Sequence, residues 1–211
     1  MTIRVTCKLK GLLLPKGSEM ITKLRRTSKR VLSPIARAFI ALGLSANSVT
    51  WIGFGLAMLY LSLAYLRFHP LVLALVLAAS SLMDAVDGEM ARARGTAGPK
   101  GAFLDSTLDR FEDSAFISGL GFLGFNQIVV VALLAASLII PYIRAKGELS
   151  GLKVEGRGII ERGERLIGIL LVLIFTALWM PLAEVLLYIL TVLSYVTVIQ
   201  RFLFVYFRLP K

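Results

Sequence analysis

Six long hydrophobic stretches constrain the fold of this chain more than any other feature of its sequence. Each is close to the roughly 20 apolar residues that an α-helix needs to cross the hydrocarbon core of a bilayer. They lie at residues 47–67, 70–93, 101–123, 126–146, 163–180 and 182–206. Because a spanning helix satisfies its own backbone hydrogen bonds in lipid, the pattern predicts an all-α integral membrane protein with six transmembrane helices.

The composition supports this class and narrows the chemistry. Hydrophobic residues make up 57% of the 211 residues and charged residues only 18%, whereas soluble domains have roughly 25% charged residues. The single cysteine, Cys7, and the single histidine, His69, exclude an intrachain disulfide, a thiolate metal cluster and a site built from several imidazoles. Catalysis would have to use carboxylates, basic groups, hydroxyls or a bound metal.

The N-terminal part of the chain is strongly basic. Ten of the 24 lysines and arginines fall within residues 1–37, against one acidic residue, Glu19. We interpret residues 20–45 as an amphipathic juxtamembrane helix on an anionic membrane surface, with a disordered basic tail as the alternative. Residues 1–19 are expected to be a detachable basic extension, with Met20 as an alternative native start. Residues 46–207 would then form the six-helix transmembrane domain.

The connections between the hydrophobic stretches differ in charge. The turns at 124–127 and 180–181 carry no charged residue. The opposite side carries the N-terminal basic residues and those near 92–100, 144–165 and 208–211. Because positively charged loops stay in the cytoplasm, we expect a multi-pass protein of the cell membrane with both termini inside.

Four aspartates interrupt the second and third stretches: Asp84, Asp87, Asp105 and Asp109. An ionised carboxylate in mid-span costs about 2.5–3.5 kcal/mol on insertion scales. Helical spacing places the first two on one helix face and the last two on another. The two helices run in opposite directions, so the pairs lie at similar depths. The sequence therefore predicts one pocket, open to the cytoplasm, in which the four carboxylates converge.

Such a cluster needs positive charge. Oxygen ligands without histidine or cysteine favour Mg²⁺, Mn²⁺ or Ca²⁺. Two such ions can clamp a phosphoryl group during displacement at phosphorus. The small residues Gly88, Ala91 and Gly101 permit close approach of a ligand, and Arg92 could hold a diphosphate.

The run Asp84-x-x-Asp87-Gly88-x-x-Ala91-Arg92, eight further residues, and Gly101-x-x-x-Asp105-x-x-x-Asp109 resembles the signature of the CDP-alcohol phosphotransferases at every fixed position. Residues 44–50, Leu-Ser-Ala-Asn-Ser-Val-Thr, are similar to the segment with which that family begins its first span. Ser45 and Ala46 replace the usual Thr and Pro. The family also has a basic amphipathic helix before six spans, so the resemblance covers most of residues 20–207.

The resemblance implies that a CDP-linked lipid donates its phosphatidyl-type group to an alcohol while CMP leaves. It implies Mg²⁺ or Mn²⁺, as two ions, and a homodimer. Asp109 would be the general base. The implied metal ligands are Asp84, Asp87, Asp105 and Asp109. The implied nucleotide and diphosphate contacts are Gly88, Ala91, Arg92, Gly101, Asn47 and Thr50.

Residues 141–148, 160–166 and 198–201 look like the phosphatidylinositol phosphate synthase branch of that family, with departures at residues 144, 146 and 147. Basic residues from three helix ends favour an anionic acceptor, since an unpaired Arg201 within an apolar span is costly and a phosphate would satisfy it. Glu161 and Glu164 are expected to pair with neighbouring basic residues. The acceptor phosphate would contact Arg144, Lys146, Arg162, Arg165 and Arg201.

The predicted function is transfer of the phospholipid phosphoryl group of CDP-diacylglycerol or CDP-archaeol onto inositol 1-phosphate, giving phosphatidylinositol or archaetidylinositol phosphate and CMP. One alternative is a phosphatidylglycerophosphate synthase that uses glycerol 3-phosphate. A cation-coupled transporter is the alternative of another class, but its acidic groups should reach both membrane sides. The expected partners are the donor lipid, the acceptor, membrane lipid and a second copy of the chain, and no nucleic acid.

Overall fold

The structure, a computed structural model, describes residues 32–209. Within that range the chain is helical and contains no strand, which confirms the all-α class. The long helices begin and end within a few residues of the stretches expected from hydropathy. They are α3 (Ala46–Tyr65), α4 (Pro70–Ala93), α5 (Pro99–Phe122), α6 (Gln127–Leu149), α7 (Arg162–Leu178) and α8 (Met180–Tyr206).

Four of these helices, α3, α4, α6 and α8, are long and apolar enough to cross a membrane. The other two differ for different reasons. Charged residues recur along the first half of α5, and α7 has only 17 residues. The four apolar helices indicate a membrane protein. Helices α5 and α7, which depart from the pattern, both carry residues of the candidate site.

Local sequence explains where several helices begin. The Ser45 side chain accepts a hydrogen bond from the Ser48 amide at 3.1 Å, so serine caps α3. The family that this sequence resembles usually has threonine at that position. Asn126 caps α6 in the same way through the Ile128 amide, at 2.9 Å. His69 precedes Pro70 and accepts from the Leu71 amide at the start of α4.

A short helix, Leu32–Ala41, is the described part of the amphipathic segment expected at 20–45. Residues 20–31 and the basic extension at 1–19 lie outside the described residues. Ala36 of this helix is buried with Val86 and Met90 of α4. The Arg94 guanidinium donates to the Leu44 carbonyl at 2.8 Å and to the Ile40 carbonyl at 3.3 Å. These contacts hold the helix against the end of α4 where the candidate site begins.

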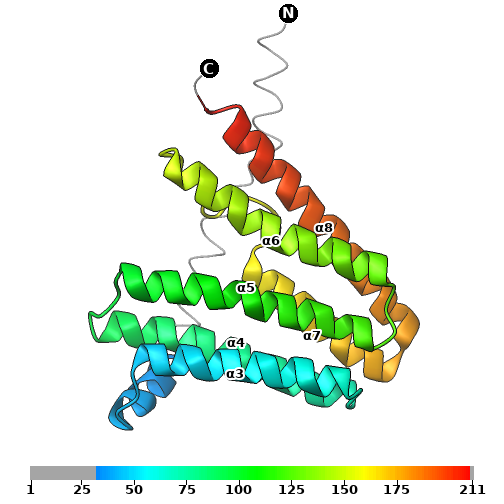
Figure 1. Ribbon diagram of the computed structural model, residues 1–211, viewed down its shortest axis with the longest axis horizontal. Helices are drawn as coiled ribbons and strands as arrows, with labels where there is room; N and C mark the ends of the chain where they lie inside the picture. Colours follow the sequence, from blue (N-terminus) through cyan, green and yellow to red (C-terminus); the bar gives the residue numbers. More distant parts are fainter. Residues whose placement is uncertain (1–31, 210–211) are drawn as a thin grey trace, which may run out of the picture.

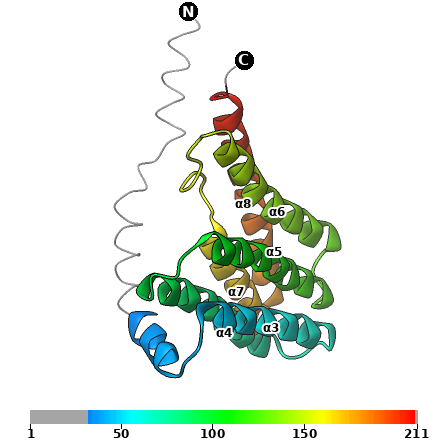
Figure 2. The same ribbon diagram turned by 60° about the vertical axis from the view of Figure 1, so that its left-hand side comes forward.

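The helices form two groups, which Figures 1 and 2 show from two directions. Helix α3 packs against α4 and α5, and α7 packs against α4. Helices α6 and α8 pair with each other and diverge from the first group (Figure 1). Short turns join α3 to α4, α5 to α6 and α7 to α8 at one end. The α4–α5 connection lies at the opposite end (Figure 1).

The contact between α3 and α5 is fixed by one buried tyrosine. The Tyr60 hydroxyl donates to the Phe116 carbonyl at 3.1 Å, and the two rings meet edge to face with centroids 5.2 Å apart. The α5 segment that carries the acidic residues is thereby held in register with α3 and, through α3, with α4.

Candidate active site

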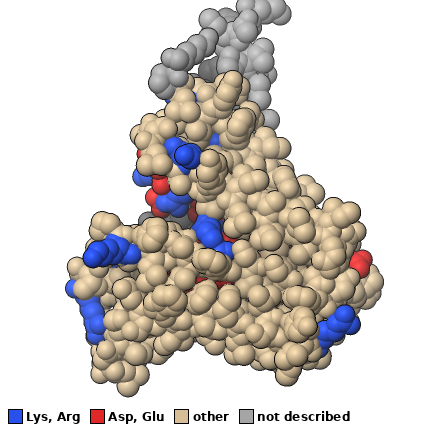
Figure 3. Space-filling model, in the orientation of Figure 1, with Lys and Arg blue, Asp and Glu red and all other residues tan. Residues whose placement is uncertain are grey.

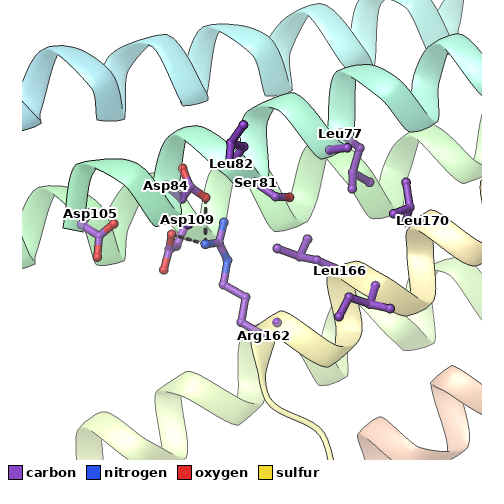
Figure 4. A pocket seen from close by; sticks show the side chains of 13 residues that line it. Leu77, Ser81, Leu82, Asp84, Asp105, Asp109, Arg162, Leu166 and Leu170 are labelled. Atoms are coloured by element: carbon purple, nitrogen blue, oxygen red, sulfur yellow. Dashed lines mark hydrogen bonds and ion pairs between the residues drawn. The ribbon is translucent and has the colours of Figure 1, made fainter. Parts of the chain in front are cut away.

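A pocket between α4, α5 and α7 is lined by three of the four expected carboxylates, Asp84, Asp105 and Asp109, but not by Asp87. A cavity of about 590 Å³ is bordered at its polar end by Asp84, Asp105, Asp109 and Arg162. Figure 4 shows Arg162 extending from α7 toward Asp84 and Asp109. The rest of the wall is apolar, with leucines of α4 and α7 facing the cavity. The leucines labelled in the figure are Leu77, Leu82, Leu166 and Leu170. The pocket therefore combines charged groups at one end with a surface suited to lipid.

Arg162 of α7 pairs with two of the motif carboxylates, Asp84 and Asp109, which form the first acidic tier of the pocket. Its Nη1 atom lies 2.9 Å from Oδ2 of Asp84 and 2.7 Å from Oδ1 of Asp109. Charge-assisted contacts of this length are strong and directional. A residue expected to bind the acceptor thus also compensates the motif aspartates.

A second acidic tier lies one helical turn further along α5. Glu112 and Asp113 are each only 1% exposed. Arg162 donates through Nη2 to Glu112 at 2.7 Å and through Nε to Asp113 at 3.2 Å. Arg165 donates through Nη2 to the other Asp113 oxygen at 2.5 Å. Sequence reasoning assigned these two acids no role, although they continue the spacing of Asp105 and Asp109.

Asp87 is positioned from α3 rather than from α7. It is buried, and its Oδ2 atom accepts a hydrogen bond from the Thr50 hydroxyl at 2.5 Å. Asp84 and Asp105 lie close enough to Asp87 to interact electrostatically. Thr50, expected among the nucleotide contacts, therefore orients one of the motif carboxylates.

The residues present fit a hard divalent cation. Asp84, Asp109 and Glu112 each offer an oxygen atom, and these atoms lie within 4.8 Å of one another. All the donors are carboxylate oxygens, the ligand type that Mg²⁺ and Mn²⁺ prefer. Glu112 joins this group although it lies outside the sequence motif.

The residues expected around the diphosphate lie near the α4–α5 connection and the start of α3, outside the lining of the pocket. A side chain at Gly88 would come 3.3 Å from the Arg92 guanidinium, and one at Gly101 would come 3.9 Å from the Asn47 amide oxygen. Arg92 is held by Glu89 through Nε and Nη2, at 3.2 and 3.0 Å. The Arg92 side chain is 61% exposed, which leaves it open to a ligand. Ala91, between these positions, is half-buried.

The start of α7 presents two arginines on one helix face. The Glu161 amide donates to the Glu164 carboxylate at 3.0 Å, a capping interaction that fixes this helix start. Arg162 and Arg165 follow one turn apart and both reach α5. Arg165 is 2% exposed, and its Nε and Nη1 atoms have no hydrogen-bond partner among the described residues. Two donor nitrogens of this buried guanidinium are therefore left for a further partner.

Arg201 is satisfied by the protein itself, contrary to the expectation of an unpaired cation. It donates to the Arg157 carbonyl at 2.7 Å, the Ile140 carbonyl at 3.3 Å and the Glu161 carboxylate at 3.3 Å. Glu161 thus pairs across to α8 rather than with the arginines beside it. Arg201 therefore fastens the loop before α7 to α6 and α8.

The remaining basic residues lie on α6. Arg144 pairs with Glu148 at 2.9 Å, and the Lys146 ammonium lies 5.8 Å above the Tyr142 ring. Arg144 and Arg165 are close enough to Arg201 to interact electrostatically. Figure 3 shows charged side chains gathered around a central hollow on an otherwise largely uncharged face. The structure therefore brings together basic residues from α6, α7 and α8.

Comparison with known proteins agrees with this geometry. Residues 43–202 match the model of the CDP-alcohol phosphatidyltransferase family. The chain belongs to this family. The signature resemblance is thereby confirmed, and the protein is a phosphotransferase enzyme of phospholipid synthesis.

Several curated relatives share the branch expected from the sequence. An archaetidylinositol phosphate synthase of Aeropyrum pernix is 45% identical over 142 residues, which cover 67% of this chain and 73% of the relative. One from Pyrococcus horikoshii is 35% identical over 183 residues, covering 86% and 94%. Each match therefore covers most of this chain and most of the relative.

Solved structures agree in fold. A phosphatidylinositol phosphate synthase of Mycobacterium tuberculosis in complex with manganese and citrate superposes with a TM-score of 0.75 at 34% identity, covering 83% of this chain and 88% of that one. The same synthase with CDP-DAG bound gives 0.73 at 35% identity, covering 84% and 94%. The CDP-alcohol phosphatidyltransferase fold thus extends through the candidate site.

Proposed function

We propose that this protein transfers the phospholipid phosphoryl group of a CDP-linked lipid onto inositol 1-phosphate, releasing CMP. The product is phosphatidylinositol phosphate or archaetidylinositol phosphate, according to the lipid chains of the donor. The observation that carries the proposal is the meeting of Asp84, Asp105 and Asp109 with Arg162 of α7 in one pocket, with Arg165 buried behind it against Asp113. The names of the curated relatives supply the acceptor class.

Asp84, Asp87, Asp105 and Asp109 are proposed to hold one or two Mg²⁺ or Mn²⁺ ions. The carboxylate group Asp84, Asp109 and Glu112 includes two of these four aspartates, and the manganese complex of the tuberculosis synthase also supports a divalent ion. Bound divalent ions would withdraw charge from the transferring phosphoryl group. The Thr50 hydroxyl keeps one Asp87 oxygen engaged, so its other oxygen can face the pocket.

Asp109 is proposed to take the proton of the acceptor hydroxyl as that oxygen attacks phosphorus. It borders the cavity together with Asp84 and lies 2.7 Å from the Arg162 guanidinium. A carboxylate at that position reaches both the donor phosphate and the acceptor. The attacking oxygen forms the new ester bond, and the bond between the lipid phosphate and CMP breaks.

The donor lipid is proposed to bind across the two kinds of surface in the cavity. Its diphosphate would lie against Gly88, Ala91 and Gly101, with Arg92 and Asn47 as polar contacts. Small residues permit this close approach, and Arg92 has exposed guanidinium donors. The apolar wall of α4 and α7 would take the part of the lipid next to the phosphate.

The acceptor phosphate is proposed to bind Arg165 and Arg162, with Arg144 and Lys146 at the α6 side. The two free donors of Arg165 are the strongest support, since a buried cation with unmet donors favours an anionic ligand. Arg201, which is held by backbone carbonyls, would add positive charge and fix the loop before α7. A neutral acceptor such as free inositol would leave these donors unmet.

We further propose that all six helices α3–α8 span the cell membrane, with the Leu32–Ala41 helix on its cytoplasmic surface. The charged residues of α5 would be tolerated because they face α4 and α7 rather than lipid. The basic residues of the 94–100 and 144–165 segments support a cytoplasmic location for the site and both termini. The protein would act as a homodimer.

The test is CMP release by the purified protein with a CDP-lipid and Mg²⁺. Inositol 1-phosphate, glycerol 3-phosphate, free inositol and serine are compared side by side. Release with inositol 1-phosphate, and little with the others, supports the proposal. Release with glycerol 3-phosphate instead would keep the reaction and overturn the acceptor. No release with any of the four, in folded and metal-supplied protein, would refute the proposed function.

A further inference from the structure

Asp113 is a buried carboxylate that the sequence motif does not include. It lies four residues after Asp109 on α5 and is 1% exposed. One of its oxygens accepts from Arg162 at 3.2 Å and the other from Arg165 at 2.5 Å. Asp113 therefore touches both arginines of α7 at the same time.

We propose that Asp113 is a positioning residue that presets Arg162 and Arg165 for the acceptor phosphate. It would set the affinity for the phosphorylated acceptor and leave the affinity for the CDP-lipid unchanged. The inference rests on the acceptor site of the proposed function. It extends that site to a residue that would not itself touch either substrate.

The first support is the orientation that the contacts impose. Arg165 uses only Nη2 for Asp113, so its Nε and Nη1 atoms stay without a partner among the described residues. Holding one edge of a planar guanidinium fixes the direction of its remaining donors. A ligand that meets an already ordered guanidinium loses less free energy to side-chain ordering than one that must arrange it.

The second support is the way Asp113 is itself held. Ser137 of α6 is fully buried, and its hydroxyl donates to Asp113 Oδ2 at 3.1 Å. Residues from α5, α6 and α7 therefore meet at this carboxylate. Because supporting hydrogen bonds fix a charged group more firmly than packing alone, the position of Asp113 depends on three helices.

The third support is charge balance. Arg165 is 2% exposed, so its positive charge needs a partner inside the protein. Asp113 is the buried carboxylate paired with Arg165. It lets that arginine stay buried and charged while the acceptor is absent. Glu112 differs, because among the described residues it forms an ion pair with Arg162 and not with Arg165.

The main test is Asp113→Asn, measured with both substrates varied separately. We expect the KM for inositol 1-phosphate to rise about tenfold, the scale of one charge-assisted hydrogen bond, while kcat and the KM for CDP-lipid stay within about twofold. In an Arg165→Gln background the same substitution should raise the acceptor KM by a smaller factor than in wild type, because only the part that acts through Arg162 remains. Glu184→Gln, which removes an exposed carboxylate of α8, is the control and should match the wild type.

Two less disruptive variants test the same inference if Asp113→Asn does not fold. Ser137→Ala removes a hydrogen bond to Asp113, and Ser194→Ala removes an equally buried serine that bonds only its own helix backbone. We expect Ser137→Ala, but not Ser194→Ala, to raise the acceptor KM by about two- to threefold, since one neutral hydrogen bond is lost.

Three results would overturn the inference. One is an unchanged acceptor KM in Asp113→Asn, another a parallel rise for both substrates, and the third equal behaviour of the two serine variants. A failure of the proposed function is distinguishable, because wild-type protein would then release no CMP with inositol 1-phosphate.

Discussion

The Nη1 atom of Arg162 lies 2.7 Å from Oδ1 of Asp109. The first residue belongs to the candidate acceptor site and the second to the candidate metal site, so the two sites share a contact. The same nitrogen also reaches Asp84 at 2.9 Å. A cation bound to these carboxylates and the guanidinium of Arg162 would therefore meet the same oxygens, and the two sites should be energetically linked.

Replacing Arg162 should make the protein more dependent on metal. Arg162→Gln leaves Asp84 and Asp109 without their positive partner, so the thermal midpoint without metal should fall by several degrees. Added Mn²⁺ should then raise the midpoint more than it does in wild type, because the ion replaces the lost charge. Thermal melts with EDTA or Mn²⁺ measure this. Equal Mn²⁺ shifts in Arg162→Gln, wild type and the exposed control Arg67→Gln would contradict the link.

Asp109→Asn should remove turnover without preventing donor binding. An amide cannot take the acceptor proton, so CMP release should fall by about 10³-fold, within the usual range for a general base and its electrostatic contribution. Binding of the CDP-lipid should change little, because Arg92, Gly88 and Asn47 stay in place. Steady-state CMP release and equilibrium lipid binding are the two measurements. Near-normal turnover in Asp109→Asn would show that Asp109 is not the general base.

The Thr50 hydroxyl should matter through Asp87. Thr50→Val keeps the side-chain shape but removes the hydrogen bond at 2.5 Å, so we expect about tenfold lower activity at limiting Mg²⁺. Thr50→Ser should retain most activity, because the donor remains. The control is Thr176→Val, whose hydroxyl bonds its own helix backbone in α7. A Mg²⁺ titration of CMP release distinguishes these variants, and similar curves for Thr50→Val and Thr176→Val would argue against the role.

Two glycines of α3 provide a matched test of packing beside the site. A Cβ atom at Gly53 would lie 2.9 Å from Oδ1 of Asp84, whereas one at Gly55 would meet nothing within 4 Å. Gly53→Ala should therefore displace Asp84 and lower CMP release severalfold, at a stability cost of about 1–3 kcal/mol typical of overpacking. Gly55→Ala should be neutral or slightly stabilising. Activity and thermal midpoints of the two variants measure this difference, and equal activity would contradict the close packing of Gly53 on Asp84.

Much of the helical framework could be predicted from the sequence because hydropathy and length set it directly. The convergence of Asp84 and Asp109 followed from helical spacing on two antiparallel helices. The sequence also grouped Arg162 and Arg165 at one helix end. These inferences depend on local periodicity, which a single sequence carries.

The side-chain partners could not be predicted in the same way. Arg201 was expected to be unpaired, but backbone carbonyls from residues 140 and 157 satisfy it. Those carbonyls come from a loop and a helix far away in the sequence, and no pattern indicates them. The role proposed for Asp113 likewise depends on Arg162 and Arg165 of α7 reaching α5, which the sequence does not show. Partner choice depends on tertiary packing, which spacing alone does not specify.

The central claim is best tested by identifying the lipid product. Purified protein is supplied with CDP-lipid, Mg²⁺ and inositol 1-phosphate labelled with ¹³C at every ring carbon, and both CMP and the lipid fraction are quantified by mass spectrometry. The account predicts one labelled inositol phosphate group in each product lipid and one CMP for each product molecule. Release of CMP without labelled lipid would show hydrolysis instead of transfer and would contradict the account.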